Sequence, residues 1–129
     1  MRANKAKGTG PELTLRKALR RSGVIGATFN PKNIPGRPDI LYRDDRLAIF
    51  INGCFWHRCP YCKYGLPKSN RIFWKKKFEM NKSRDIRKAR ELRKLGYSVM
   101  TVWECQIDRN LNAQIQRVIK RKGINGNEK

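Results

Sequence analysis

Apolar residues recur along the chain at two spacings, one typical of helices and the other typical of strands. Near the N-terminus the spacing is helical and predicts a helix that begins near Pro11, has Thr9 as its N-cap and ends at Gly23. The longest helical stretch spans residues 69–95 and is closed by Gly96. A third, shorter helix is predicted over residues 108–121.

Shorter apolar and aromatic runs predict strands over residues 27–29, 39–42, 47–51 and 97–103. Residues 47–51 are apolar throughout, which is typical of a strand that is buried on both faces. The order of helix, strands, helix, strand and helix indicates a single α/β domain with a mixed central sheet flanked by helices. Outside this core we expect a flexible basic arm over residues 1–8 and a C-terminal tail over residues 122–129.

Charge changes this picture of an ordinary small domain. The 129 residues include 31 lysines and arginines against 10 acids, a formal net charge of +21. Because such a charge opposes folding by self-repulsion, we expect a polyanionic partner, nucleic acid before an anionic membrane. The longest apolar run is too short to span a bilayer, and residues 1–5 contain no apolar core of a secretory signal. We therefore expect a cytoplasmic protein, associated with the nucleoid in a prokaryote.

Four cysteines form the first candidate site. Cys54, Cys59 and Cys62 follow a C-x4-C-x2-C spacing, and Cys105 lies after the last predicted strand. In a reducing compartment this set favours a tetrahedral structural zinc site. Three alternatives remain open: a plant-type [2Fe–2S] cluster, a redox pair at Cys59 and Cys62, and buried cysteines without a ligand. The single histidine, His57, could also replace one cysteine as a ligand.

Two further residues suit phosphodiester hydrolysis. Asp39 opens a predicted strand, where a carboxylate can hold Mg²⁺ against a phosphate, although most Pro-Asp pairs are simply turns. His57 titrates near neutral pH and can take a proton from water, although a lone histidine is more often structural. Glu12 could orient a metal-bound water, or could simply be an acid in the first turn of a helix.

Aromatic and basic side chains form the last candidate group. Phe55, Trp56 and Trp74 are either core residues or wedges that unstack base pairs. The predicted helix over residues 69–95 is rich in lysine and arginine and could lie along DNA phosphates.

Four motifs together resemble the very-short-patch-repair (Vsr) mismatch endonucleases over residues 9–105. They are PGRPDI at 35–40, IFINGCFWH at 49–57, FW at 73–74 and VWEC at 102–105. The resemblance implies a restriction-endonuclease-like three-layer core. It also implies Mg²⁺-dependent nicking of double-stranded DNA beside a T:G mismatch, leaving a 5′-phosphate. Mismatch-repair proteins would be further partners, and we expect the chain to act as a monomer.

The resemblance also assigns roles to individual residues. Asp39 would be the essential Mg²⁺ ligand, with the main-chain carbonyl of Ile51 as a second, and His57 would be the general base. Glu12 would occupy the acidic position of the first helix. Zinc would be held by Cys54, Cys59, Cys62 and Cys105. Cys59 occupies a position at which a histidine can be the zinc ligand in the family. The residues expected to contact DNA are Phe55, Trp56, Trp74, Lys75, Asn81 and Arg84.

The chain departs from the family pattern at Ile51 and Asn52, where family members often carry Thr-His. Asn52 can donate a hydrogen bond to a phosphate but cannot exchange a proton near neutral pH. The cysteine loop also differs in length by one residue. Related nucleases include homing and restriction-type enzymes, so these remain alternatives. A non-catalytic, zinc-containing DNA-binding module is the alternative outside enzymes.

Overall fold

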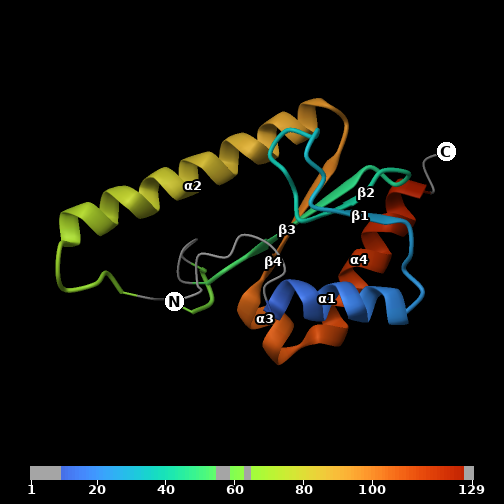
Figure 1. Cartoon of the computed structure of the whole chain (residues 1–129), viewed down its shortest axis with the longest axis horizontal. Coiled ribbons are helices and arrows are strands. Elements are labelled where there is room, and N and C mark those ends of the chain that lie inside the picture. Colours follow the sequence, from blue (N-terminus) through green and yellow to red (C-terminus); the bar gives the residue numbers. More distant parts are fainter. Residues whose placement is uncertain (1–9, 55–58, 63–64, 127–129) are drawn as a thin grey trace.

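The structure, a computed structural model, describes residues 10–54, 59–62 and 65–126, with side chains to residue 123 (Figure 1). It contains four helices and four strands within these residues. In chain order they are α1 (Gly10–Arg21), β1 (Ala27–Phe29), β2 (Ile40–Tyr42), β3 (Leu47–Asn52), α2 (Arg71–Lys94), β4 (Ser98–Trp103), α3 (Glu104–Arg109) and α4 (Leu111–Gly126).

The strands form one sheet in the order β1-β2-β3-β4. Strand β2 is antiparallel to both of its neighbours, β1 and β3, with Ile40 opposite Ile49. The last pair is parallel, with Asn52 opposite Trp103. A parallel pair needs a crossover connection, and α2 lies within the segment that joins β3 to β4. The mixed sheet predicted from the sequence is therefore confirmed.

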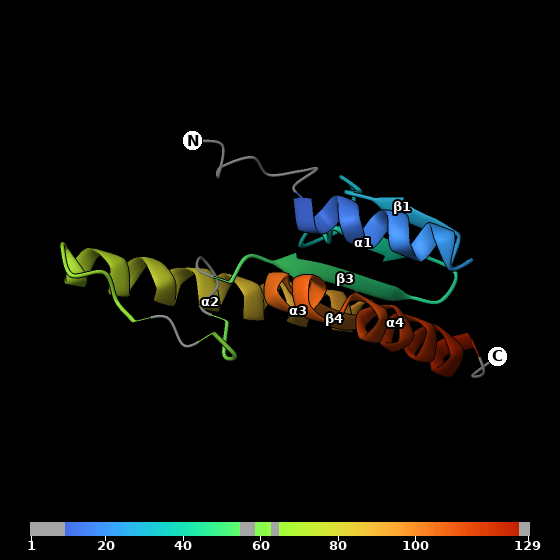
Figure 2. The same ribbon diagram turned by 90° about the horizontal axis from the view of Figure 1, so that it is seen from below.

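Helices cover both faces of this sheet (Figures 1 and 2). On one face α1, α3 and α4 enclose the larger core, in which Leu15, Ile107 and Val118 meet Ile49 and Val102. On the other face Leu92 of α2 packs with Leu41 and Ala48. Leu47 and Ile49 point into the first core and Ala48 into the second, as expected for a strand buried on both faces.

Helix α2 extends well beyond the sheet at its N-terminal end (Figure 1). Phe78 and Leu92 are its buried residues, whereas Ile72 is 82% exposed and Phe73 is 57% exposed. The predicted helix over residues 69–95 is confirmed, but only its C-terminal half packs firmly on the sheet. Within the described residues, no helix combines the length and apolar character needed to cross a membrane.

The C-terminal region differs from the single helix predicted over residues 108–121. Two helices, α3 and α4, occupy it and are separated at Asn110, and α4 continues to Gly126, into the residues expected to form a C-terminal tail. The Gln106 side chain accepts a hydrogen bond from the Trp103 N–H at 3.0 Å, so α3 begins directly after β4. The Asn110 side chain accepts the Ala113 N–H at 3.3 Å and acts as an N-cap for α4. These two side-chain hydrogen bonds account for the earlier start and for the break.

Candidate metal centre and active site

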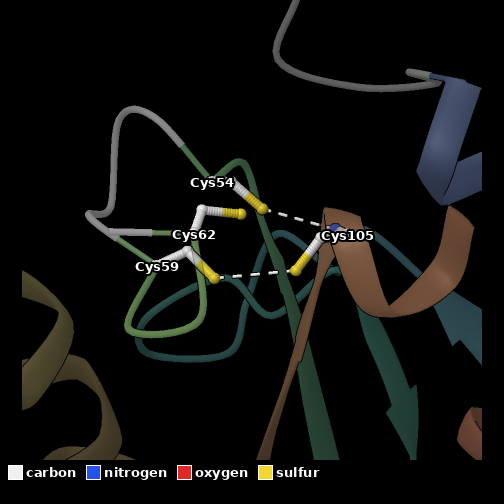
Figure 3. A group of neighbouring side chains, drawn as sticks. All are labelled: Cys54, Cys59, Cys62 and Cys105. Atoms are coloured by element: carbon white, nitrogen blue, oxygen red, sulfur yellow. Dashed lines mark hydrogen bonds between the residues drawn. The ribbon is translucent and has the colours of Figure 1, made fainter. Parts of the chain in front are cut away.

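The four cysteines meet at one end of the sheet (Figure 3). Their sulfur atoms all lie within 4.8 Å of one another, and the Sγ atoms of Cys59 and Cys105 are 3.7 Å apart. A tetrahedral zinc site with Zn–S bonds of about 2.3 Å has sulfur–sulfur edges of about 3.8 Å. The spacing and the soft donor set therefore fit a structural zinc ion.

The parallel strands bring these cysteines together. Cys54 follows the end of β3, and Cys105 lies in α3 directly after β4. Because the two strands are parallel, both cysteines lie at the same end of the sheet. The Cys105 N–H donates to the Cys54 sulfur at 3.3 Å, and the Tyr61 N–H donates to the Cys59 sulfur at 3.4 Å. The Cys54 N–H donates to the Glu104 carboxylate at 3.4 Å. Main-chain donors directed at sulfur stabilise thiolates, which are the form that binds metal.

Thiol pKa values in the cluster move in opposite directions. Burial raises the pKa of Cys54 and, together with the Cys59 side chain, that of Cys105. Burial also acts on Cys59, but N–H donors from Tyr61 and Cys62 leave its pKa below the ordinary value. Four neighbouring thiols can all ionise only beside a cation that neutralises them, so the cluster suits a divalent metal ion.

Asp39 lies at the other candidate centre, directly before β2. Its main-chain N–H donates to the Ile49 carbonyl and its own carbonyl accepts the Asn30 N–H, both at 3.0 Å. Its Oδ2 atom accepts the main-chain N–H of Ile51 at 2.6 Å. Burial, together with the charge of Glu12, raises the pKa of Asp39 to about 6, although the Ile51 hydrogen bond opposes this shift. Asp39 is thus a fixed, partly buried carboxyl group in an unfavourable place for a lone negative charge.

The Ile51 carbonyl lies on the same side of β3 as this carboxylate. In a strand, the N–H and C=O of one residue point to the same side, and the Ile51 N–H is directed at Asp39. The predicted main-chain ligand and the predicted carboxylate ligand are therefore neighbours. Both offer oxygen, which is the donor that Mg²⁺ prefers.

Glu12 of α1 belongs to the same centre. It is 2% exposed, and its Oε2 atom accepts hydrogen bonds from the Arg16 guanidinium and, at 3.1 Å, from the Asn30 side chain. The Arg16 guanidinium also lies over the Phe29 ring, 4.4 Å from its centroid. Glu12 does lie in the first turn of a helix, where an acid can be favourable even when it is exposed to solvent. Its burial and its hydrogen bonds are not explained by that position alone.

Asn30 connects the two acids. Its side chain donates to the Glu12 carboxylate and its main-chain N–H donates to the main-chain carbonyl of Asp39. Asn30 has a positive φ of 49°, which asparagine tolerates better than most residues. A double contact of this kind fixes α1 relative to the start of β2. The structure therefore brings together three predicted site residues, Glu12, Asp39 and Ile51.

Asn52 lies on the opposite face of the sheet from the Ile51 side chain. It is 9% exposed and lines a small cavity between the sheet and α2. Successive strand residues point to opposite faces, so Asn52 approaches this end of the sheet from the α2 side. The other residues of the cavity are Phe50, Asp85, Lys88, Ala89, Val99 and Thr101.

The predicted DNA-contacting residues are only partly described. Phe55, Trp56 and the predicted base His57 fall within residues 55–58, outside the described part of the chain. Trp74 is half-buried, stacks on Phe78 with ring centroids 5.6 Å apart and meets the edge of Phe73. In this structure Trp74 thus packs against other aromatic rings. Lys75 and Arg84 are exposed on α2, and Asn81 is half-buried there.

Three residues near Asp39 were not predicted from the sequence: Arg16, Asn30 and Lys88. Arg16 stands four residues after Glu12 on a helix, a spacing at which side chains of opposite charge meet, so it could have been found. Asn30 and Lys88 carried no such signal, because only the tertiary fold brings them close.

Comparisons with known proteins agree on one family. Residues 1–63 match the family described as DNA mismatch endonuclease Vsr. A type II nicking enzyme of Xanthomonas oryzae is 40% identical over 110 residues, covering 83% of this chain and 78% of the relative. A type II nicking enzyme of Neisseria meningitidis is 40% identical over 102 residues (79% and 72%). The DNA mismatch endonuclease Vsr of Escherichia coli is 35% identical over 107 residues (83% and 68%).

Proposed function

Because the chain belongs to the Vsr family of DNA mismatch endonucleases, we propose that it nicks one strand of double-stranded DNA beside a T:G mismatch. The reaction is a Mg²⁺-dependent hydrolysis that leaves a 5′-phosphate, carried out on a restriction-endonuclease-like core. The observation that carries this proposal is the convergence of Asp39, Glu12 and the Ile51 main chain where β2 begins beside β3.

Asp39 and the Ile51 carbonyl are the residues that would hold Mg²⁺. The raised pKa of Asp39 supports this, since a partly buried carboxylate beside another acid gains most from a cation. Mg²⁺ held there would neutralise charge on the scissile phosphate and increase the acidity of the attacking water. Glu12, already fixed by Arg16 and Asn30, would accept a hydrogen bond from that water and orient it.

His57 is proposed as the general base. It would take a proton from the attacking water as the new P–O bond forms and the bond to the 3′ oxygen breaks. Asn52 would donate its amide hydrogens to a non-bridging phosphate oxygen from the α2 side of the sheet. These roles rest on the family motif together with the placement of Asn52.

The cysteine cluster would serve as a structural zinc site. It links the residues that follow β3 to α3, through Cys54 and Cys105. Cys54 and Cys59 also bracket residues 55–58 in the sequence. Zinc would therefore fix both ends of the segment that contains the proposed base and the aromatic residues proposed to unstack DNA.

The charge distribution supports a DNA substrate. All lysines and arginines of α2 except Lys88 are exposed, on a helix that extends beyond the sheet (Figure 1). Phosphate contacts from such side chains fix the position of a duplex without reading its sequence. Lys75 and Arg84 are proposed to make such contacts, with Asn81 beside them.

The direct test is nicking of three substrates side by side: a matched duplex, the same duplex with a T:G mismatch, and supercoiled plasmid. We expect Mg²⁺-dependent nicking of the mismatched duplex, no nicking by the Asp39→Ala and His57→Ala variants, and DNA binding by all three proteins. Nicking that survives in both variants would refute the assigned mechanism. Equal nicking of matched and mismatched DNA would favour a restriction-type or homing-type nuclease.

A non-catalytic DNA-binding module is the second candidate, favoured by the neutral Asn52 at a position where family members often carry histidine. It predicts tight binding that weakens steeply with salt and no cleavage with Mg²⁺, Mn²⁺ or Ca²⁺.

A further inference from the structure

Lys88 differs from every other basic residue of α2. The other lysines and arginines of this helix are exposed, whereas Lys88 is half-buried on the side that faces the sheet. It lies one turn before Leu92, which is 0% exposed in the smaller core. In such a position the aliphatic stem of a lysine packs on the neighbouring surface while its ammonium group extends to a polar space.

The loop that leads to Asp39 rests directly on the Lys88 side chain. Gly36 in this loop has a φ of +80°, and a Cβ atom added there would lie 3.1 Å from Lys88 Cβ and 3.5 Å from its Cγ. The close approach therefore depends on glycine at position 36. It places the aliphatic stem of Lys88 against the chain three residues before Asp39.

The same side chain borders the cavity that Asn52 lines. Both residues face this small space, together with Asp85 and Thr101.

We propose that Lys88 is a further phosphate-binding residue of the active site, which binds a non-bridging oxygen of the scissile phosphate alongside Asn52. The inference rests on the proposed function and adds to it a residue that the family motifs do not contain. An ammonium group has three hydrogen-bond donors and no acceptor, so it suits a phosphate oxygen. Lys88 transfers no proton; it stabilises negative charge that grows on the phosphate as water attacks.

The test compares Lys88→Met, Lys88→Arg and a control, Lys120→Met, which removes the same charge from an exposed position on α4. Single-turnover nicking of the T:G duplex at saturating enzyme measures the chemical step. Binding of the same duplex with Ca²⁺ in place of Mg²⁺ measures affinity. Thermal melting verifies that each variant is folded.

We expect Lys88→Met to lower the single-turnover rate by about 100-fold, the loss typical of one donor to a reacting oxyanion. Its affinity for DNA should change by no more than about threefold, because one phosphate contact among many carries little of the binding free energy. Lys88→Arg should recover most of the rate, and Lys120→Met should match the wild-type chain.

The inference fails if folded Lys88→Met nicks as fast as Lys120→Met. It also fails if saturating enzyme restores the full rate, since Lys88 would then act only in general DNA binding. Either result leaves the proposed function intact, because the wild-type chain nicks in the same assay. A wild-type chain that does not nick would overturn the proposed function and this inference together.

Discussion

The Ile51 N–H donates to Oδ2 of Asp39 at 2.6 Å, and this hydrogen bond fixes the orientation of the carboxylate at the start of β2. The same bond opposes the rise in the Asp39 pKa, but burial outweighs it and the pKa reaches about 6. The folded chain therefore carries a carboxylate that is less stable as an anion than it is in the unfolded chain. Such a cost is expected where a site is arranged for a cation rather than for stability.

Asp39→Asn should for this reason stabilise the protein in the absence of added Mg²⁺ while abolishing nicking. The amide oxygen can still accept the Ile51 N–H, but the charge is gone. With a pKa of about 6 folded and 3.8 unfolded, the wild-type chain loses stability as pH rises from about 4 to 6. Above that range the raised pKa of Asp39 lowers the free energy of unfolding by about 3 kcal/mol.

Urea unfolding of both proteins at pH 4 and pH 8 measures this difference. The variant should be more stable at pH 8, and its advantage should largely disappear at pH 4. A variant that is less stable than the wild-type chain at pH 8 would show that burial of Asp39 carries no such cost.

Arg16→Met should destabilise the fold, because it leaves Glu12 buried with the Asn30 side chain as its remaining described partner. Removing one member of a buried ion pair typically costs about 3–5 kcal/mol, and partial exposure of Arg16 places the expected loss near the lower end. Chemical denaturation measures the change. In the double variant with Glu12→Gln, much of the loss should be recovered; purely additive effects would argue against coupling between the two residues.

Zinc content should follow the cysteine ligands. We expect about one zinc per purified chain by elemental analysis, loss of zinc and a much lower melting temperature in Cys105→Ala, and retention of zinc in Cys59→His, since imidazole is also a zinc ligand. Cys105 is the informative position because it joins α3 to the residues that follow β3. Iron with visible absorption would instead indicate an iron–sulfur cluster, and absence of metal would favour unliganded cysteines.

The amino-acid sequence predicts much of this molecule, for reasons that are local. Apolar spacing predicts α2 and β3, and the cysteine spacing indicates a metal site. The split between α3 and α4 was missed because it depends on two side-chain hydrogen bonds rather than on apolar spacing.

The surroundings of Asp39 could not be predicted in the same way. Asn30 contacts Glu12 across 18 positions of sequence, and Lys88 meets Gly36 across an even longer separation. Neither contact follows from periodicity or from a motif. Each exists because α1 and α2 pack on opposite faces of the sheet and the loop between β1 and β2 contacts both helices. The motif thus identified the carboxylate, and only the tertiary structure identified its neighbours.

Gly36→Ala offers a test of how closely that loop depends on α2, with Gly23→Ala as a matched control. Both glycines have a φ near +80°, so both substitutions should cost about 1–2 kcal/mol from the backbone alone. A Cβ at position 23 meets nothing within 4 Å, whereas one at position 36 lies 3.1 Å from Lys88 Cβ. Gly36→Ala should therefore be the more destabilising of the two in chemical denaturation, and it alone should slow nicking, because the displaced loop carries Asp39. Equal losses of stability with unchanged nicking in both variants would mean that the loop and α2 can separate without disturbing the catalytic carboxylate.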